Sequence, residues 1–106
     1  MTSLDKVMTY ITERYRFNDE TYPGFSKLTM EEKRRFAINH SILHMNKSIG
    51  KLAAEVESLD HGGGMDEEAL RVATVKMFVN TLVLAERLGM DDEQLAGAVP
   101  GVMKSK

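Results

Sequence analysis

Residues 66–88 form a segment whose apolar side chains would surround a helix almost completely. Projected at about 100° per residue, they leave only two narrow polar strips. These side chains are Leu70, Val72, Ala73, Val75, Met77, Phe78, Val79, Leu82, Val83, Leu84, Ala85 and Leu88. A helix that is apolar on most sides must be buried on most sides, so this segment strongly constrains the fold.

A single chain of 106 residues offers little cover for such a helix. We therefore predict a homodimer in which residues 66–88 lie at the centre of a four-helix or larger bundle. The alternative is a compact monomer in which the N-terminal residues wrap around this helix.

Helix start and stop signals place a long helix before this segment. Thr29 and Glu32 have the spacing of a capping box, in which each side chain satisfies a backbone N–H of the other residue. The glycines at positions 62–64 should end this helix after Leu59 or Asp60. Asp66 can then cap the apolar helix, which should end near Leu88 with Gly89 beyond it.

The N-terminal part of the chain predicts one short helix and a connection. Apolar residues at helical spacing indicate a helix over residues 4–15, with Thr2 as its N-cap. Residues 17–28, which contain Pro23 and Gly24, are expected to form a turn-rich connection.

Asp91 and Gln94 start a short fourth helix, which we expect to end before Pro100. Strand-like alternation and internal repeats are both missing from the sequence. We therefore predict a single all-α domain over residues 1–106. It should be a helical bundle of two long and two short helices, completed by dimerisation.

The composition limits the classes of partner. The net charge is −2 and the sequence contains no cysteine. Disulfides, thiolate zinc sites and cysteine nucleophiles are thereby excluded, and no overall positive field attracts nucleic acid or acidic lipid. The N-terminal residues lack the apolar core of a signal peptide, and no apolar run is long enough to span a bilayer. We expect a cytoplasmic protein with neither a nucleic-acid nor a membrane partner.

The long helix is predicted to have two different faces. One face is apolar, and we expect it to be the core stripe: Ile38, Ile42, Met45, Ile49, Leu52, Ala53, Val56 and Leu59. The other face carries a polar row at i,i+3 and i,i+4 spacing: His40, His44, Lys47, Lys51, Glu55 and Ser58.

Three interpretations of the polar row remain open. It can be a solvated face, as amphipathic helices require. It can bind an anion, because two imidazoles and two ammonium groups in one line suit a phosphate. A metal site is the third, since His40 and His44 have the spacing of a helical zinc pair, although the neighbouring lysines oppose a cation. Weak candidates to complete such a site are Glu55, Glu57, Asp60 and His61.

Six of the seven aromatic residues lie within the first 36 positions: Tyr10, Tyr15, Phe17, Tyr22, Phe25 and Phe36. They could stack on a nucleobase, but such residues more often hold a chain segment onto a bundle.

Two stretches carry a resemblance to a known family. The first is Lys51-Leu52-Ala53-Ala54-Glu55-Val56-Glu57-Ser58-Leu59, and the second ends in Ala85-Glu86-Arg87-Leu88-Gly89-Met90-Asp91. A glutamate-containing helix followed by an apolar helix with an Ala-x-x-Leu-Gly-x-Asp ending resembles the MazG-like all-α nucleoside triphosphate pyrophosphohydrolases. The resemblance implies helical dimers or tetramers that hold magnesium around a nucleotide with acidic residues on two helices.

The residues at the family's acidic positions differ in this chain. Glu55 matches one acid of the first helix, but Ser58 stands three residues later. Ala73 and Lys76 occupy the positions of the second acidic pair, and a lysine cannot ligate magnesium.

The leading hypothesis is therefore a MazG-like dimer that binds a phosphorylated small molecule, with a nucleotide as one possibility. The ligand-binding residues would be His40, His44, Lys47, Lys51 and Glu55. Pyrophosphohydrolysis stays open, with Mg²⁺ as the cofactor if it occurs. The alternative is a non-enzymatic module for helical oligomerisation or protein interaction, and a divalent-metal hydrolase is a third reading.

Overall fold

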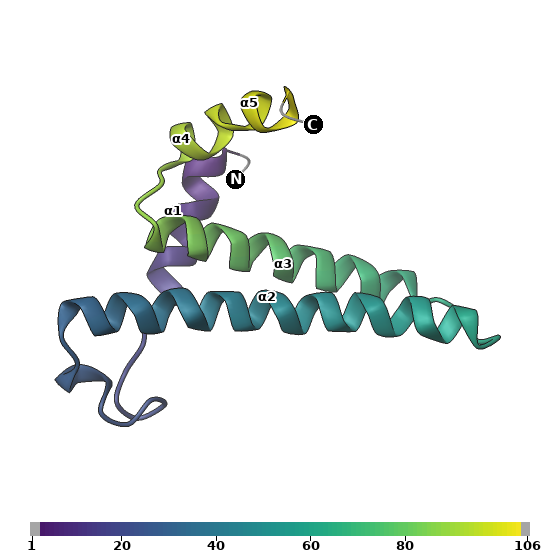
Figure 1. The fold of residues 1–106 in the computed structure, drawn as a ribbon, viewed down its shortest axis with the longest axis horizontal. Coiled ribbons are helices and arrows are strands. Elements are labelled where there is room, and N and C mark those ends of the chain that lie inside the picture. The colour runs from purple at the N-terminus through teal and green to yellow at the C-terminus, as the bar shows by residue number, and fades with distance from the viewer. Residues whose placement is uncertain (1–2, 105–106) are drawn as a thin grey trace.

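The computed structural model describes residues 3–104, and residues 1–2 and 105–106 lie outside the description. The described chain is helical and contains no strand, as predicted. Its helices are α1 Leu4–Arg14, α2 Met30–Asp60, α3 Glu67–Arg87, α4 Asp92–Gly97 and α5 Val99–Lys104, with a 3₁₀ turn at Phe25–Lys27 (Figure 1). Within residues 3–104, no helix has the length and apolar character that a membrane crossing needs.

Helices α2 and α3 form a long antiparallel hairpin (Figure 1). The predicted capping box is present at the start of α2: Thr29 Oγ1 accepts from Glu32 N and Glu32 Oε1 accepts from Thr29 N. At the turn, Gly62 adopts a φ of +86°, which favours glycine. The Asp66 side chain caps α3 by accepting from Ala69 N. The sequence signals for both ends of this hairpin are therefore confirmed.

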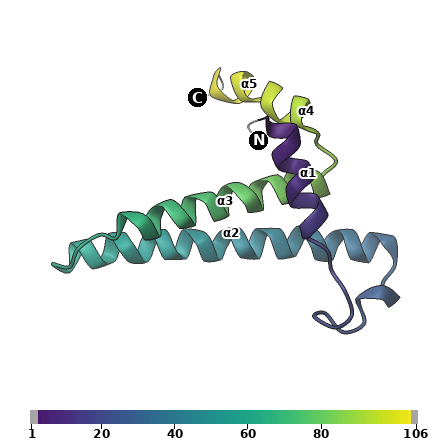
Figure 2. The ribbon, with the colours of Figure 1, turned by 180° about the vertical axis from the view of Figure 1, so that it is seen from behind.

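Helix α1 packs across the C-terminal part of α3. The buried contact joins Met8 and Ile11 of α1 to Leu82, Val83 and Ala85 of α3. Helix α1 lies behind α3 in Figure 1 and in front of it in Figure 2, so it covers only one side of the hairpin.

Two details at the chain ends differ from the sequence prediction. The N-cap of α1 is Ser3, whose hydroxyl accepts from Lys6 N, whereas Thr2 lies outside the described residues. At the other end, α4 stops before Pro100 as expected, but a further short helix, α5, contains this proline. Proline is tolerated there because the first turn of a helix needs no backbone N–H from it.

The prediction that the apolar stripe of α2 forms the core is wrong for the single chain. The residues of α2 that are buried in the single chain are small: Ala37, Ser41 and Ser48. Much of the apolar stripe is instead about half exposed, as shown by Ile42 at 50%, Ile49 at 47% and Val56 at 51%. The helical projection identified the apolar face of α2 correctly. Helix α3 nevertheless packs along the neighbouring row of α2, because the short side chains of that row allow the two helices to approach closely.

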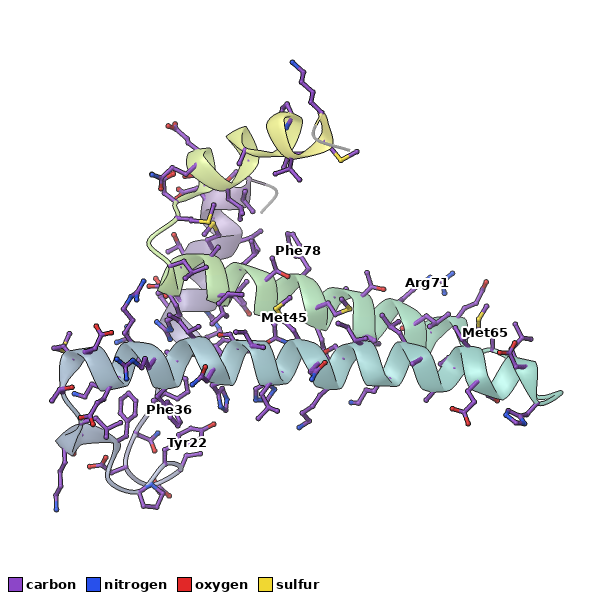
Figure 3. All side chains as sticks on the ribbon, viewed as in Figure 1. Tyr22, Phe36, Met45, Met65, Arg71 and Phe78 are labelled. Atoms are coloured by element: carbon purple, nitrogen blue, oxygen red, sulfur yellow. The ribbon has the colours of Figure 1, made fainter. Side chains whose placement is uncertain are left out.

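Helix α3 is only partly covered in the single chain, as the sequence predicts. Leu82, Val83, Ala73 and Ala85 are buried, whereas Phe78 is 50% exposed. Figure 3 shows Phe78 pointing away from α2. One chain therefore covers only part of the circumference of α3.

Candidate functional site

A cavity with basic walls lies between α2, α3 and the C-terminal end of α1. Its volume is about 310 Å³. We call it the basic cavity, and its walls are Tyr15, His44, Lys47, Ser48, Lys51, Val75, Lys76, Val79 and Asn80. The spacing of His44, Lys47 and Lys51 brings them onto one side of α2, and Lys76 faces them from α3.

All ionisable side chains of the basic cavity, apart from the phenol of Tyr15, are bases. Lys47, Lys51 and Lys76 supply three ammonium groups, and His44 adds an imidazole. No carboxylate is among the described wall residues. Bases of one sign around a single cavity without a carboxylate would favour an anion bound between them.

Two buried polar side chains of the basic cavity lack a protein partner. Asn80 is 8% exposed and Ser48 is 5% exposed. Neither the Asn80 amide nor the Ser48 hydroxyl has a hydrogen bond within residues 3–104. Among these residues, only Arg87 Nε is both unpartnered and fully enclosed by protein. The polar groups of Asn80 and Ser48 therefore keep some exposed surface, and both residues line the basic cavity.

An amide or hydroxyl at the surface of a cavity can pair with water or with another occupant of that cavity. Side chains of this kind are normally satisfied by protein or bound water. Asn80 therefore offers two N–H donors and one oxygen acceptor to an occupant of the cavity.

His40 lies outside the basic cavity, in an aromatic cluster. Its Nε2 is 3.1 Å from the hydroxyl of Tyr22, and its ring stacks on Phe36 with centroids 5.8 Å apart. Figure 3 shows Tyr22 and Phe36 together on the side of α2 away from α3. Burial, the neighbouring His44 imidazole and the Lys47 ammonium lower the pKa of His40 below its ordinary value of 6.5. In this structure His40 helps to hold the connection 17–28 against α2.

The aromatic cluster explains most of the N-terminal aromatic residues. The ring of Phe17 lies within 5.0–5.3 Å of the rings of Tyr22, Phe25, Phe36 and His40, measured between centroids. Its members come from the connection and from α2, so the prediction that aromatic residues fasten the N-terminal arm is confirmed for them.

The predicted acidic candidates are not gathered into one site. Glu55 Oε1 accepts a hydrogen bond of 2.8 Å from Asp66 N and so holds the start of α3. Glu57 pairs with His61 at 4.0 Å on an exposed surface, and Asp60 is exposed. Within residues 3–104 no group of three or more His, Cys, Asp or Glu side chains is arranged to hold a metal ion.

A second, larger cavity of about 580 Å³ borders the first at Tyr15. It contains Arg16, Lys33, Arg34 and Arg87. Here Glu86 Oε2 lies 2.8 Å from Arg87 Nη1, and the Glu86 carboxylate neutralises part of the positive charge of this cavity. The free Arg87 Nε of the larger cavity is enclosed by protein, whereas the basic cavity has no acid and presents the Asn80 amide and the Ser48 hydroxyl at its walls, so we take the basic cavity as the candidate site.

Sequence reasoning identified His44, Lys47 and Lys51 but missed Lys76 and Asn80. Both interrupt an otherwise apolar helix, and they are four residues apart. This spacing was the available signal, because i,i+4 residues share one side of a helix.

The structure also locates the positions at which the pyrophosphohydrolase family carries its acids. Ala73 is buried and Lys76 lines the basic cavity. Comparisons with protein-family models, with curated proteins and with solved structures gave no match. The MazG-like resemblance therefore stays a prediction.

Proposed function

We propose that this protein binds a phosphorylated small molecule in the basic cavity. The observation that carries the proposal is the nearly buried, unpartnered amide of Asn80, which lies among three lysines. Phosphate oxygens would accept hydrogen bonds from this amide and from the lysines at once. The ligand would thus satisfy both the excess of positive charge and the unpaired polar groups.

The number of bases favours a phosphate over a single carboxylate. Lys47, Lys51 and Lys76 provide three positive charges, and a phosphate ester or diphosphate presents several charged oxygens to them. A carboxylate would leave most of these charges uncompensated. A nucleotide is one member of the proposed ligand class, and the half-exposed ring of Tyr15 stands at the edge of the cavity.

We propose binding without metal-assisted hydrolysis. The two helices would need several oxygen ligands to hold a magnesium ion around a triphosphate. In this chain the corresponding positions are Ser58, Ala73 and Lys76 beside the single acid Glu55, whose carboxylate is already engaged by Asp66 N. Lysines would take the place of the metal in neutralising the ligand.

Isothermal titration calorimetry of the full chain with inorganic triphosphate, without magnesium, tests the proposal. In the variant Lys47→Ala/Lys51→Ala, affinity should fall roughly 100-fold, because two charge-assisted contacts are lost. The matched control is Lys6→Ala/Lys27→Ala, which removes the same charge from exposed positions outside the cavity. It should change affinity less than about threefold, as expected for distant surface charges.

Two results would contradict the proposal. One is an equal loss of affinity in the control, which would mean that net charge alone attracts the ligand. The other is a wild-type chain that shows no heat of binding with triphosphate or with adenosine triphosphate at millimolar concentration.

A further inference from the structure

The side of the α2/α3 hairpin opposite the basic cavity carries mostly apolar side chains. We call it the apolar face. It consists of Ile38, Ile42, Met45, Ile49, Leu52, Val56 and Leu59 of α2 with Leu70, Thr74, Phe78 and Thr81 of α3. Helix α1 lies on the other side of the hairpin (Figures 1 and 2). Five of these side chains are about half exposed: Ile42, Ile49, Val56, Leu59 and Phe78.

We infer that the apolar face binds a second copy of this chain, with α2 of one copy packed antiparallel along α2 of the other. This inference is independent of the proposed ligand. It rests on the spacing of the apolar residues, on the charge distribution along the hairpin and on the size of the exposed face.

The apolar residues of α2 follow a heptad pattern. Ile42, Ile49 and Val56 are β-branched and occur at every seventh position. Met45, Leu52 and Leu59 occur at every seventh position in the other row, and Ile38 begins it. Alternating rows of this type form the seam by which one α-helix packs along another. Helix α3 packs on the adjacent row of Ser41 and Ser48, so Ile38, Met45 and Leu52 are partly covered, whereas Ile42, Ile49 and Val56 stay exposed.

The heptad pattern of α2 is symmetric about position 47. Around position 47, Met45 mirrors Ile49, Ile42 mirrors Leu52, and Ile38 mirrors Val56. An antiparallel pair centred there therefore matches each of these six residues with a residue of the other row, and beyond them Leu59 lies opposite Arg35. All three layers on each side of the centre are then apolar, and both copies use the same surface, as a two-fold dimer requires.

The charges of the hairpin favour the antiparallel direction. The turn end, residues 55–71, contains six carboxylates and one arginine, whereas residues 33–35 at the other end of α2 are Lys33-Arg34-Arg35. An antiparallel pair brings the acidic turn of each copy beside the basic end of the other. A parallel pair would place two acidic turns side by side, which is unfavourable.

The part of the apolar face on α3 is compatible with burial. The hydroxyls of Thr74 and Thr81 donate to the carbonyl oxygens of Leu70 and Met77 at 2.7 and 2.8 Å. Their hydrogen-bonding capacity as donors is thus met within the helix, and covering them leaves no unpaired O–H group.

The face is also large enough for a stable pair. Helix α3 has 21 residues. A helix of that length spans about 32 Å, and two packed helices present a surface roughly 20 Å wide. Each copy would bury about 600 Å², and the total of about 1,200 Å² reaches the lower end of specific interfaces. The single chain has a radius of gyration of 16.6 Å. A compact chain of this length would have about 13 Å.

Cysteine cross-linking tests this arrangement, because the sequence contains no native cysteine. The variants are Ile38→Cys and Val56→Cys, each made separately in the full chain and oxidised alone or as an equal mixture. In the antiparallel register the two substituted positions face each other across the two copies. We expect a disulfide-linked dimer in the mixture, at least tenfold more abundant than in either variant alone.

The matched control is a mixture of Ile38→Cys with Ile42→Cys, which lie at the same end of α2 and should not cross-link. Cross-linking of each variant alone would indicate a parallel pair and would overturn the inference. Sedimentation equilibrium on the wild-type chain covers the case in which cysteine disturbs packing. A wild-type chain that is monomeric at tens of micromolar would also overturn the inference of an antiparallel dimer. A wild-type dimer together with the mixed cross-link would support that inference.

Discussion

The two sides of the α2/α3 hairpin differ in almost every physical property. On one side, α1 and the aromatic cluster cover the helices and leave a small cavity lined by lysines and a free amide. On the other side, a regular apolar seam lies open. Hydrophobic periodicity and burial in the single chain are therefore separate properties of α2. Here the apolar row Ile42, Ile49 and Val56 of α2 is exposed in the single chain, while small residues make the contact with α3.

The largest expected effect is on the apolar side. In Ile49→Lys a charge enters the seam close to the two-fold axis in both copies at once. Losing two buried isoleucines costs about 4 kcal/mol, so the dimer dissociation constant should rise roughly 1,000-fold. Sedimentation equilibrium measures it. The control Val102→Lys adds the same charge at an exposed position of α5 and should leave the dimer intact. An unchanged dissociation constant in Ile49→Lys would show that the seam is not the interface.

On the basic side, a substitution of Asn80 should affect ligand binding and the stability of the chain differently. Asn80→Leu removes an unpaired buried amide and keeps a similar volume. We expect the free energy of unfolding to rise by about 1 kcal/mol and the affinity for inorganic triphosphate to fall about tenfold. Urea denaturation and calorimetry measure the two quantities. A loss of stability with unchanged affinity would mean that Asn80 has a structural role.

The third prediction concerns pH. Because the pKa of His40 is lowered in the folded chain, the unfolded chain binds the proton first as the pH falls below 6.5. The free energy of unfolding should therefore decrease as the pH falls from 6.5 to the pKa of His40 in the folded chain. Below that pH, His40 should contribute no further change. In His40→Phe, which retains an aromatic ring in the cluster, the urea midpoint should change less between pH 7.5 and pH 5.5. Equal decreases in the two proteins would exclude His40 as a source of this dependence.

The smallest effect is expected for Glu55→Gln. Its amide oxygen can still accept from Asp66 N, so stability should fall by less than about 1 kcal/mol. Because Glu55 holds the hairpin and does not line the basic cavity, triphosphate affinity should change less than threefold. A tenfold loss of affinity would instead place this carboxylate at the ligand, as the sequence hypothesis had it.

Much of the fold could be predicted from the sequence because its signals are local. The capping residues Thr29, Asp66 and Asp91 and the glycines 62 and 89 act within one turn of the backbone, and all of them end or begin helices as expected. The row of α2 that contacts α3 was not predictable in the same way. Its choice depends on how closely two helices approach, and a hydrophobicity pattern does not contain that distance.

The candidate site was predictable only in part, for a similar reason. His44, Lys47 and Lys51 share one helix, so their spacing alone groups them. Lys76 and Asn80 join them through the packing of α3, while His40 is drawn into the aromatic cluster by Tyr22 and Phe36. Contacts between segments distant in sequence decided these three positions.

The side-chain amide signal of Asn80 in a nuclear magnetic resonance titration with inorganic triphosphate reports directly on whether the basic cavity holds the phosphate. The protein contains three other asparagines, Asn18, Asn39 and Asn46, all on exposed positions. If the basic cavity holds the phosphate, the Asn80 amide resonances shift in a saturable way and those of Asn39 and Asn46 stay in place. Asn80 resonances that do not move at saturating triphosphate, or that move no more than those of Asn46, would contradict the account.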